Sequence, residues 1–299
     1  MKKSLLKALT IFIVFSLICY YFDTKSPDSS YYVNTEFATT VNALNKIHPQ
    51  KSSTLRIMSY NLLADTPGFM GSPAYLRSAD VCFMLNTLKP DVTGFQEVSR
   101  NWAYCLNRDT DYKFISPLKT NFMGTMTIIM YNKETLLLCQ WGEYVFEKTH
   151  DGNLRCAVWG VFKEKATEKS FIVINTHLSL SYNEKDTAIK QAQEILDLAH
   201  NLYAEYNYPL FFTGDFNSGI RYSGYNASSC VYETLCTSLT DTLRLAPQKS
   251  HGENLSTSSH SVDHIFAKGE PDVKEYVILS QPYFKNLSDH YPIFIDFTL

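Results

Sequence analysis

Short apolar runs separated by polar turns occupy most of the chain, a pattern typical of β-strands. Nine runs rich in β-branched and aromatic residues predict strands at 55–60, 91–95, 125–131, 156–162, 171–176, 209–213, 262–267, 273–279 and 293–299. Two longer stretches, at about 73–88 and 184–206, carry apolar residues at helical spacing. Many strands and few helices predict an α/β fold in which packed sheets are flanked by helices.

The first 22 residues form a separate apolar segment. Lys2, Lys3 and Lys7 precede a run without charge at 8–22. That run spans about 22 Å as a helix, against a bilayer core of about 30 Å, and two preceding leucines nearly close the difference. We interpret the segment as an uncleaved signal anchor, with a cleaved signal peptide and a buried core helix as alternatives. The basic flank predicts that the rest lies outside the cytoplasm, membrane-anchored or secreted.

The polar stretch at 23–52 lacks sustained periodicity, although a partial helix over 36–47 fits the pattern. It predicts a tether, followed by one folded domain over 53–299. The net charge of -3 and the pI of about 6.2 are not those of a general polyanion binder. A nucleic-acid substrate is weakened but not excluded, because a local basic groove or a bound metal can supply positive charge.

Seven cysteines are present, but no two are spaced as a CxxC pair, which argues against a zinc cluster. Cys230 and Cys236 are close enough in sequence to pair in an exported protein. Buried free thiols are the alternative.

Polar side chains recur where the predicted strands end. Asn61, Glu97, His177 and Asp215 closely follow strands, and further Asp and His residues flank the strands near the C-terminus. Such positions converge on one rim of a sheet. Carboxylate and amide oxygens suit a hard cation such as Mg²⁺, and histidines suit proton transfer. Because no GxSxG motif is present, the pattern favours hydrolysis by an activated water.

Six segments together resemble the endonuclease/exonuclease/phosphatase superfamily, which includes deoxyribonuclease-I-like nucleases and neutral sphingomyelinases. They are SYNLL at 59–63, PDVTGFQEV at 90–98, INTHLS at 174–179, FTGDFNS at 212–218, SVDHIF at 261–266 and SDHYPI at 288–293. They span the domain in the family's order. The resemblance implies a four-layer α/β sandwich with two packed mixed β-sheets. It also implies phosphoester hydrolysis with Mg²⁺, or alternatively Mn²⁺ or Ca²⁺.

The resemblance implies a metal site and a phosphate contact. Glu97 resembles the family's principal metal ligand, Asn61 lies beside it on the metal or the phosphate, and Asp289 resembles a further acidic group there. Arg77, placed before PDVTGFQEV as in many relatives, is expected to reach the substrate phosphate.

The resemblance further implies five catalytic residues. His290 resembles the histidine that activates the attacking water, and Asp263 the carboxylate that orients it. Asp215 resembles an acid/base or water-orienting aspartate, and it is the alternative base. Asn217 and His177 resemble the groups that hold and neutralise the phosphoryl oxygens.

Read singly, most of these residues have an ordinary structural interpretation. Asn61 suits a turn, His177 a core position, Asp215 a helix cap, Asp289 a strand cap and Arg77 a solvated helix face. Their joint occurrence in family order favours the functional interpretation.

Four positions depart from relatives. Leu63 replaces the acidic residue of abasic-site endonucleases and argues against that branch, and His264 replaces a common tyrosine. Thr125 replaces a glutamate, and Asn132 an arginine, that often accompany the histidine equivalent to His177. These last two changes predict weaker support for the charge on His177.

The favoured function is a phosphodiesterase acting on nucleic acid or nucleotides. One alternative is a sphingomyelinase-like lipid phosphodiesterase that acts on phospholipid headgroups, favoured by the membrane segment and by Phe69 and Met70 in a loop. The others are a degenerate, non-catalytic binder of phosphorylated ligands and a phosphomonoesterase. The protein is expected to act as a monomer that contacts the membrane through its N-terminal segment.

Overall fold

The computed structural model describes residues 32–65, 73–117, 126–146, 155–180, 185–219, 229–251, 262–269 and 271–299. The signal anchor predicted at 1–22 lies outside these ranges, as do Thr125, Phe69 and Met70. Within them, no helix is both long and apolar enough to cross a membrane. The anchor and its topology therefore stay predictions.

Among the described residues, thirteen strands form two mixed sheets. Sheet A has the order β10-β12-β13-β1-β2-β4-β3, with β1 (Leu55–Asn61), β2 (Val92–Val98), β3 (Lys113–Ile115), β4 (Met126–Tyr131), β10 (Gln248–His251), β12 (Asp272–Ile278) and β13 (Ile293–Thr298). Sheet B has the order β5-β6-β7-β8-β11-β9, with β5 (Leu136–Val145), β6 (Cys156–Glu164), β7 (Ser170–His177), β8 (Leu210–Asp215), β9 (Thr240–Asp241) and β11 (Asp263–Lys268). All nine predicted strands are present, with small shifts at their ends.

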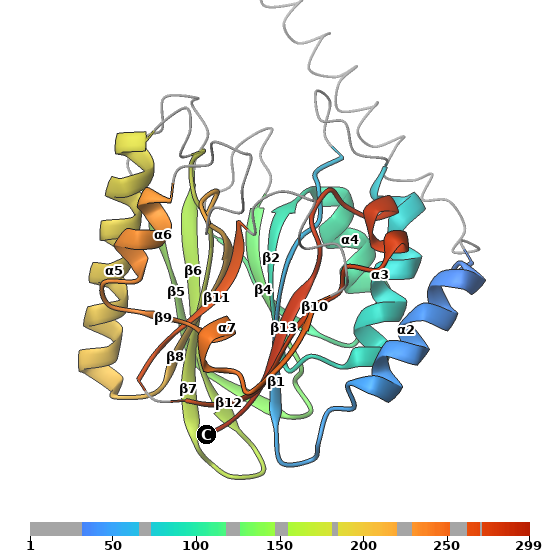
Figure 1. The fold of residues 1–299 in the computed structure, drawn as a ribbon, viewed down its shortest axis with the longest axis horizontal. Helices are drawn as coiled ribbons and strands as arrows, with labels where there is room; N and C mark the ends of the chain where they lie inside the picture. Colours follow the sequence, from blue (N-terminus) through green and yellow to red (C-terminus); the bar gives the residue numbers. More distant parts are fainter. Residues whose placement is uncertain are drawn as a thin grey trace, which may run out of the picture. The chain divides into compact units, whose positions relative to one another are not determined.

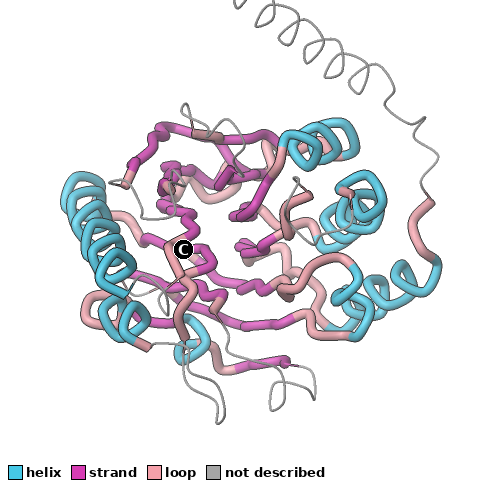
Figure 2. The backbone as a smooth tube through the Cα atoms, turned by 90° about the horizontal axis from the view of Figure 1, so that it is seen from above, coloured by secondary structure: helices cyan, strands magenta, loops and turns pink. Residues whose placement is uncertain are grey.

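Helices cover the outer face of each sheet (Figures 1 and 2). On sheet A lie α2 (Thr35–Ile47), α3 (Ala74–Leu88) and α4 (Arg100–Asp109), and on sheet B lie α5 (Lys185–Tyr206) and α6 (Cys230–Leu235). Two short elements, α7 (Thr242–Leu245) and the 3-10 helix η1 (Pro282–Asn286), complete the list of described helices. This arrangement confirms the predicted four-layer α/β sandwich.

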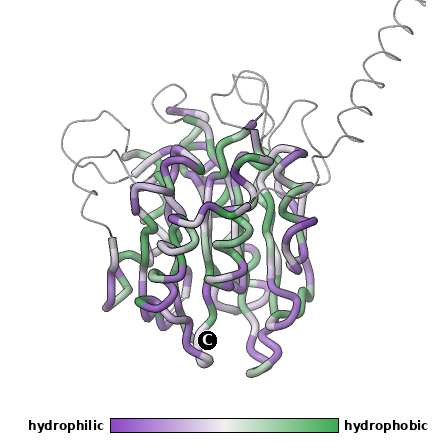
Figure 3. The backbone as a smooth tube through the Cα atoms, turned by 90° about the vertical axis from the view of Figure 1, so that its right-hand side faces the viewer, coloured by the Kyte–Doolittle hydropathy of each residue, from purple (hydrophilic) through white to green (hydrophobic). Residues whose placement is uncertain are grey.

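Three apolar clusters hold the layers together. One packs α2, α3 and α4 against sheet A, one fills the space between the sheets, and one packs α5 and α6 against sheet B. The turns at the ends of the molecule are mostly hydrophilic, whereas the strands between them carry long hydrophobic stretches (Figure 3). Burial of these clusters is the main favourable contribution to folding.

The structure corrects the domain boundary predicted at residue 53. Helix α2 begins after Asn34, whose side chain accepts hydrogen bonds from two N–H groups of the first turn. Phe37, Val41 and Leu44 are buried in the cluster on sheet A, and the compact unit begins at Val33. The predicted polar tether at 23–52 therefore does not include the residues from Val33 onward. Only three apolar residues anchor this helix, which is why its periodicity is weak in the sequence.

The six cysteines within the described ranges carry thiols rather than disulfides. Cys230 and Cys236 lie at the two ends of α6, six positions apart. Six helical residues rise about 9 Å, beyond the Cα separation of about 7 Å that a disulfide tolerates. The helix therefore explains why this predicted pairing does not form.

Candidate active site

Strand register brings most of the predicted site residues to one end of the crevice between the two sheets. On sheet B, His177 ends β7, Asp215 ends β8 and Asp263 begins β11. His177 pairs in register with Asp215, and Asp215 pairs in register with Asp263. On sheet A, Asn61 ends β1 and lies opposite Gln96 of β2. The ends of the strands thus bring these site residues of both sheets to the same end of the sandwich.

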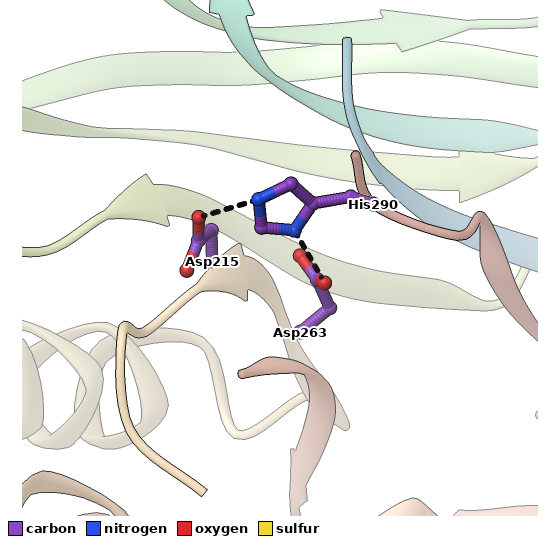
Figure 4. A group of neighbouring side chains, drawn as sticks. All are labelled: Asp215, Asp263 and His290. Carbon is purple, nitrogen blue, oxygen red and sulfur yellow. Dashed lines mark hydrogen bonds and ion pairs between the residues drawn. The ribbon is translucent and has the colours of Figure 1, made fainter. Parts of the chain in front are cut away.

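A histidine and two aspartates, His290, Asp215 and Asp263, lie next to one another at this end of the sheets (Figure 4). Nδ1 of His290 lies 2.7 Å from Oδ2 of Asp263, and its Nε2 lies 3.6 Å from Oδ2 of Asp215. Burial alone would lower the pKa of His290. The carboxylates of Asp263, Asp215 and Asp289 outweigh burial and raise that pKa well above its usual range. The geometry is that of an imidazole oriented by one carboxylate and facing a second.

Asp215 is almost fully buried and receives several donors. Its Oδ1 accepts a hydrogen bond from the backbone N–H of Asn217 at 2.9 Å, and its Oδ2 accepts one from Nδ2 of Asn61 at 3.0 Å. Burial raises the pKa of Asp215 to about 6, with the nearby charge of Asp263 adding to the rise. Two carboxylates this close favour a bound proton or a bound cation.

Glu97 is held at the end of β2 by an unusual backbone conformation. Its φ of 56° lies in the left-handed region, and the pairing of β2 with β4 shifts register between Phe95 and Val98. Such a conformation is unfavourable for a side chain other than glycine and often occurs at functional sites. Oε2 of Glu97 accepts from the backbone N–H of Ala64 at 2.9 Å, and Oε1 accepts from Nδ2 of Asn61 at 3.2 Å. Asn61 therefore bridges the carboxylates of Glu97 and Asp215.

His177 and Asn217 lie on the sheet B side of the crevice. Nε2 of His177 is 3.5 Å from Oδ2 of Asp215. Burial, and then the positive charges of Arg155 and His290, lower the pKa of His177 well below its usual range, so it is neutral near pH 7. Nδ2 of Asn217 donates to the carbonyl of Leu178 at 2.8 Å, which fixes the direction of this amide.

The residues can hold a divalent cation. Asp215, Asp263 and His290 offer three ligand atoms that lie within 4.8 Å of one another, the one such group among the described residues. This group differs from the predicted ligand set of Asn61, Glu97 and Asp289. Asp289 lies beside the pair of Asp263 and His290, which we call the dyad, with Oδ1 3.9 Å from Nε2 of His290 and its side chain 63% exposed. Oxygen donors predominate in both groups, which suits Mg²⁺ or another hard cation.

Arg77 does not have the predicted role of phosphate contact. Its guanidinium is buried in α3 and donates to the carbonyls of Leu62 at 2.6 Å, Leu63 at 2.7 Å and Leu287. It also stacks over the ring of Trp102 at 4.8 Å. Burial lowers the pKa of Arg77. Through these hydrogen bonds Arg77 instead connects the segment that follows Asn61 with the segment that precedes Asp289.

We expect Arg77→Met to lower the free energy of unfolding by about 3 kcal/mol, because the buried carbonyls lose their donors. Because the guanidinium is directed at the backbone, Arg77→Lys should leave the KM for substrate and inhibition by phosphate within about twofold of wild type. Denaturant unfolding and steady-state kinetics measure the two effects. A large rise in KM for Arg77→Lys without loss of stability would restore the phosphate role.

Two of the four departures from relatives, Asn132 and His264, lie away from the site residues. The N–H of Asn132 donates to the carbonyl of Asp91, at the start of β2 and thus at the opposite end of the sheet from Glu97. His264 points to the outer side of sheet B, where its Nδ1 lies 3.3 Å from Oδ2 of Asp241. Asn132 therefore does not affect the charge on His177 by direct contact, contrary to the prediction from the sequence.

Two contacts at the site could not be foreseen from the sequence. Nη1 of Arg155 donates to the carbonyl of His177 at 3.3 Å, which brings a cation to the sheet B side. Oγ of Ser288 donates to the carbonyl of Asn61 at 2.7 Å and accepts from the N–H of His290 at 3.1 Å. The position of Ser288 in the SDHYPI segment is the only sequence signal for these two hydrogen bonds.

Comparisons with known proteins bear on the family and the fold of the chain. A sequence model described as the endonuclease/exonuclease/phosphatase family matches residues 58–290. No curated protein was found to match the sequence.

Solved structures with similar folds have different functions. A mannosyl-6-phosphatase from Bacteroides thetaiotaomicron VPI-5482 is 20% identical with a TM-score of 0.69, over 82% of this chain and 100% of that chain. The human Nocturnin catalytic domain with bound sulfate is 18% identical with a TM-score of 0.61, over 83% and 94%. D. rerio TDP2 with a single-strand DNA product is 18% identical with a TM-score of 0.62, over 83% and 100%. At these identities the likeness shows the fold alone.

Proposed function

Because the chain belongs to the endonuclease/exonuclease/phosphatase family, we propose that it hydrolyses phosphoesters by attack of water on phosphorus, assisted by a divalent cation. The observation that carries the proposal is the meeting of Asp263, His290 and Asp215 in the crevice that also holds Glu97. A degenerate binder would not need this complete set. Hydrolysis is therefore preferred to the non-catalytic alternative.

In the proposed mechanism His290 takes the proton of the attacking water at Nε2. Asp263 holds Nδ1 at 2.7 Å and so fixes both the tautomer and the plane of the ring. The carboxylates that raise the pKa of His290 favour its charged form, so a cation bound nearby would have to lower that pKa for Nε2 to accept the proton. Asp215, with its raised pKa, can orient the same water or return a proton to the leaving oxygen.

The sheet B side would hold the phosphoryl group. His177 is neutral, so its imidazole offers one N–H donor to a phosphoryl oxygen rather than a full charge. Nδ2 of Asn217, which the carbonyl of Leu178 holds in place on the turn after Asp215, is the second donor that we propose for these oxygens. A Mg²⁺ ion held by the carboxylates of Glu97 and Asp289 would neutralise the charge that develops on these oxygens, and Nδ2 of Asn61 would hold the Glu97 carboxylate in place.

For the substrate we propose a phosphodiester of nucleic acid or of a nucleotide, as the sequence predicts. The fold shared with TDP2, solved with a single-strand DNA product, supports this class. The second candidate is a sugar phosphomonoester, supported by the fold shared with the mannosyl-6-phosphatase. The described side chains at the crevice include the carboxylates of Glu97, Asp215, Asp263 and Asp289. That acidic surround favours a short substrate over a long polyanion.

The test is a hydrolysis panel with the purified full chain. Plasmid DNA, RNA, a dinucleotide, a hexose 6-phosphate, inositol phosphates and sphingomyelin are each incubated with Mg²⁺ and with a chelator. We expect Mg²⁺-dependent release of product from the dinucleotide or the hexose phosphate. Cleavage of sphingomyelin alone would favour the lipid alternative, and binding without turnover of any substrate would favour the non-catalytic one.

A further inference from the structure

The candidate site is divided between the two sheets. Asn61 and Glu97 belong to sheet A, and the segment that carries Asp289 and His290 leads into β13 of the same sheet. His177, Asp215 and Asp263 belong to sheet B. On the proposed function, the cation is thus held mainly by sheet A and the phosphoryl group mainly by sheet B. The separation of the sheets must then be fixed for turnover.

A buried polar network joins the sheets directly beneath the site, with Asn175 of β7 at its centre. Nδ2 of Asn175 donates to the carbonyls of Phe95 at 2.9 Å and Ile128 at 2.8 Å, both in sheet A. Its Oδ1 accepts from Nε2 of Gln96 at 2.7 Å and from Oγ1 of Thr213 at 3.0 Å. All the hydrogen-bonding positions of this amide are therefore occupied, by groups on the three strands β2, β4 and β8.

Each member of the network lies next to a site residue in sequence. Gln96 precedes Glu97, Asn175 lies two positions before His177, and Thr213 lies two positions before Asp215. All three network residues are fully buried. Because residues two apart in a strand share a face, Asn175 and Thr213 face the same crevice as the histidine and the aspartate above them. A displacement of Asn175 or Thr213 would therefore also displace His177 or Asp215.

The sheets approach each other unusually closely at this point. A Cβ atom added to Gly94 would lie 2.0 Å from Oγ1 of Thr213 and 2.5 Å from Oδ1 of Asn175. Away from this network, a cluster of apolar side chains packs between the sheets. Apolar packing tolerates small sliding, whereas a fully bonded amide permits one register only. The network is thus suited to fixing geometry.

We propose that Asn175, Gln96 and Thr213 are positioning residues, which set the distance between Glu97 on sheet A and His177 and Asp215 on sheet B. They touch neither substrate nor metal in this account. They act by holding the two halves of the proposed site at the spacing that turnover requires.

The test compares two threonines of equal burial. Thr213→Val removes the hydroxyl that bonds to Asn175, and Thr213→Ser keeps it. Thr176→Val is the matched control, because Thr176 is also fully buried at the same end of sheet B but its hydroxyl donates to the carbonyl of Cys156 within that sheet.

We expect Thr213→Val to lower kcat about tenfold or more, with KM and the Mg²⁺ dissociation constant from calorimetry within about twofold of wild type. Thr213→Ser should recover most of the activity. Thr176→Val should lose similar thermal stability but keep kcat within about twofold. Equal losses of kcat in the two valine variants would overturn the positioning role.

A second readout does not depend on turnover. Mn²⁺ added in place of Mg²⁺ relaxes nearby nuclei, so the broadening of the His177 imidazole resonances reports their distance from the cation. We expect that broadening to change in Thr213→Val and to stay as in wild type in Thr176→Val. Identical broadening in all three proteins would refute the inference. If wild type hydrolyses no substrate, the proposed function fails, and the Mn²⁺ measurement still decides the network's role.

Discussion

Replacing His290 with alanine is expected to lower turnover by about a thousandfold or more, and Asp263→Asn by about a hundredfold or more. The 2.7 Å contact between Nδ1 of His290 and Oδ2 of Asp263 means that the two side chains act as a unit. The double variant should therefore lose little beyond His290→Ala. The measurement is the full mutant cycle of kcat, with Mg²⁺ affinity measured alongside and expected to be nearly unchanged by Asp263→Asn.

The cycle has a matched control in the same sheet. Asp241 and His264 form a second buried pair, 3.3 Å apart, on the outer side of sheet B. Asp241→Asn should lower stability but change turnover less than about tenfold, because this pair does not face the crevice. Strictly additive losses for Asp263 and His290 would show that they work independently and would remove the dyad from the mechanism.

The Asp263→Asn variant should also change the NMR titration of His290. Asp263 is one of the carboxylates that raise the pKa of His290. Its neutral replacement should therefore lower that pKa in the metal-free protein, as followed by NMR titration of the imidazole.

Glu97→Gln is expected to lower Mg²⁺-dependent turnover at least about a hundredfold while the fold is kept. Glutamine has the same shape and can still accept the hydrogen bond from Ala64, so the backbone of β2 should not rearrange. What it lacks is the charge that holds the cation. Mg²⁺ calorimetry and steady-state kinetics measure the effect, and the exposed Glu36→Gln on α2 is the control. Unchanged turnover at saturating Mg²⁺ would remove Glu97 from the metal role.

The sequence predicted the fold class and nine of the thirteen described strands, because those nine carry apolar, β-branched runs; β3, β5, β9 and β10 were not predicted. Asn61, Glu97, His177 and Asp215 could be placed on one rim from the strand pattern alone. The role of Arg77 could not be predicted, since its partners are backbone carbonyls far apart in sequence. The sequence pattern shows that a residue such as Arg77 is polar and near a motif. It does not show whether the side chain points toward the substrate or bonds to backbone carbonyls.

The inter-sheet network was equally hidden. Asn175 and Thr213 read as ordinary polar residues of the INTHLS and FTGDFNS segments. Their contact depends on how two separate sheets stack, and no local pattern encodes that stacking. The α2 boundary was missed for a related reason, because its few apolar residues are meaningful only against the face of α3 that they cover.

The central claim is that this crevice hydrolyses phosphoesters with the help of a divalent cation. The most direct measurement titrates Mg²⁺ into the metal-stripped full chain and follows both binding heat and turnover on the best substrate of the panel. The account predicts that turnover rises from near zero in step with occupancy of the site and disappears when a chelator is added. Turnover that is already complete in the stripped protein, and is indifferent to Mg²⁺ and chelator, would contradict it.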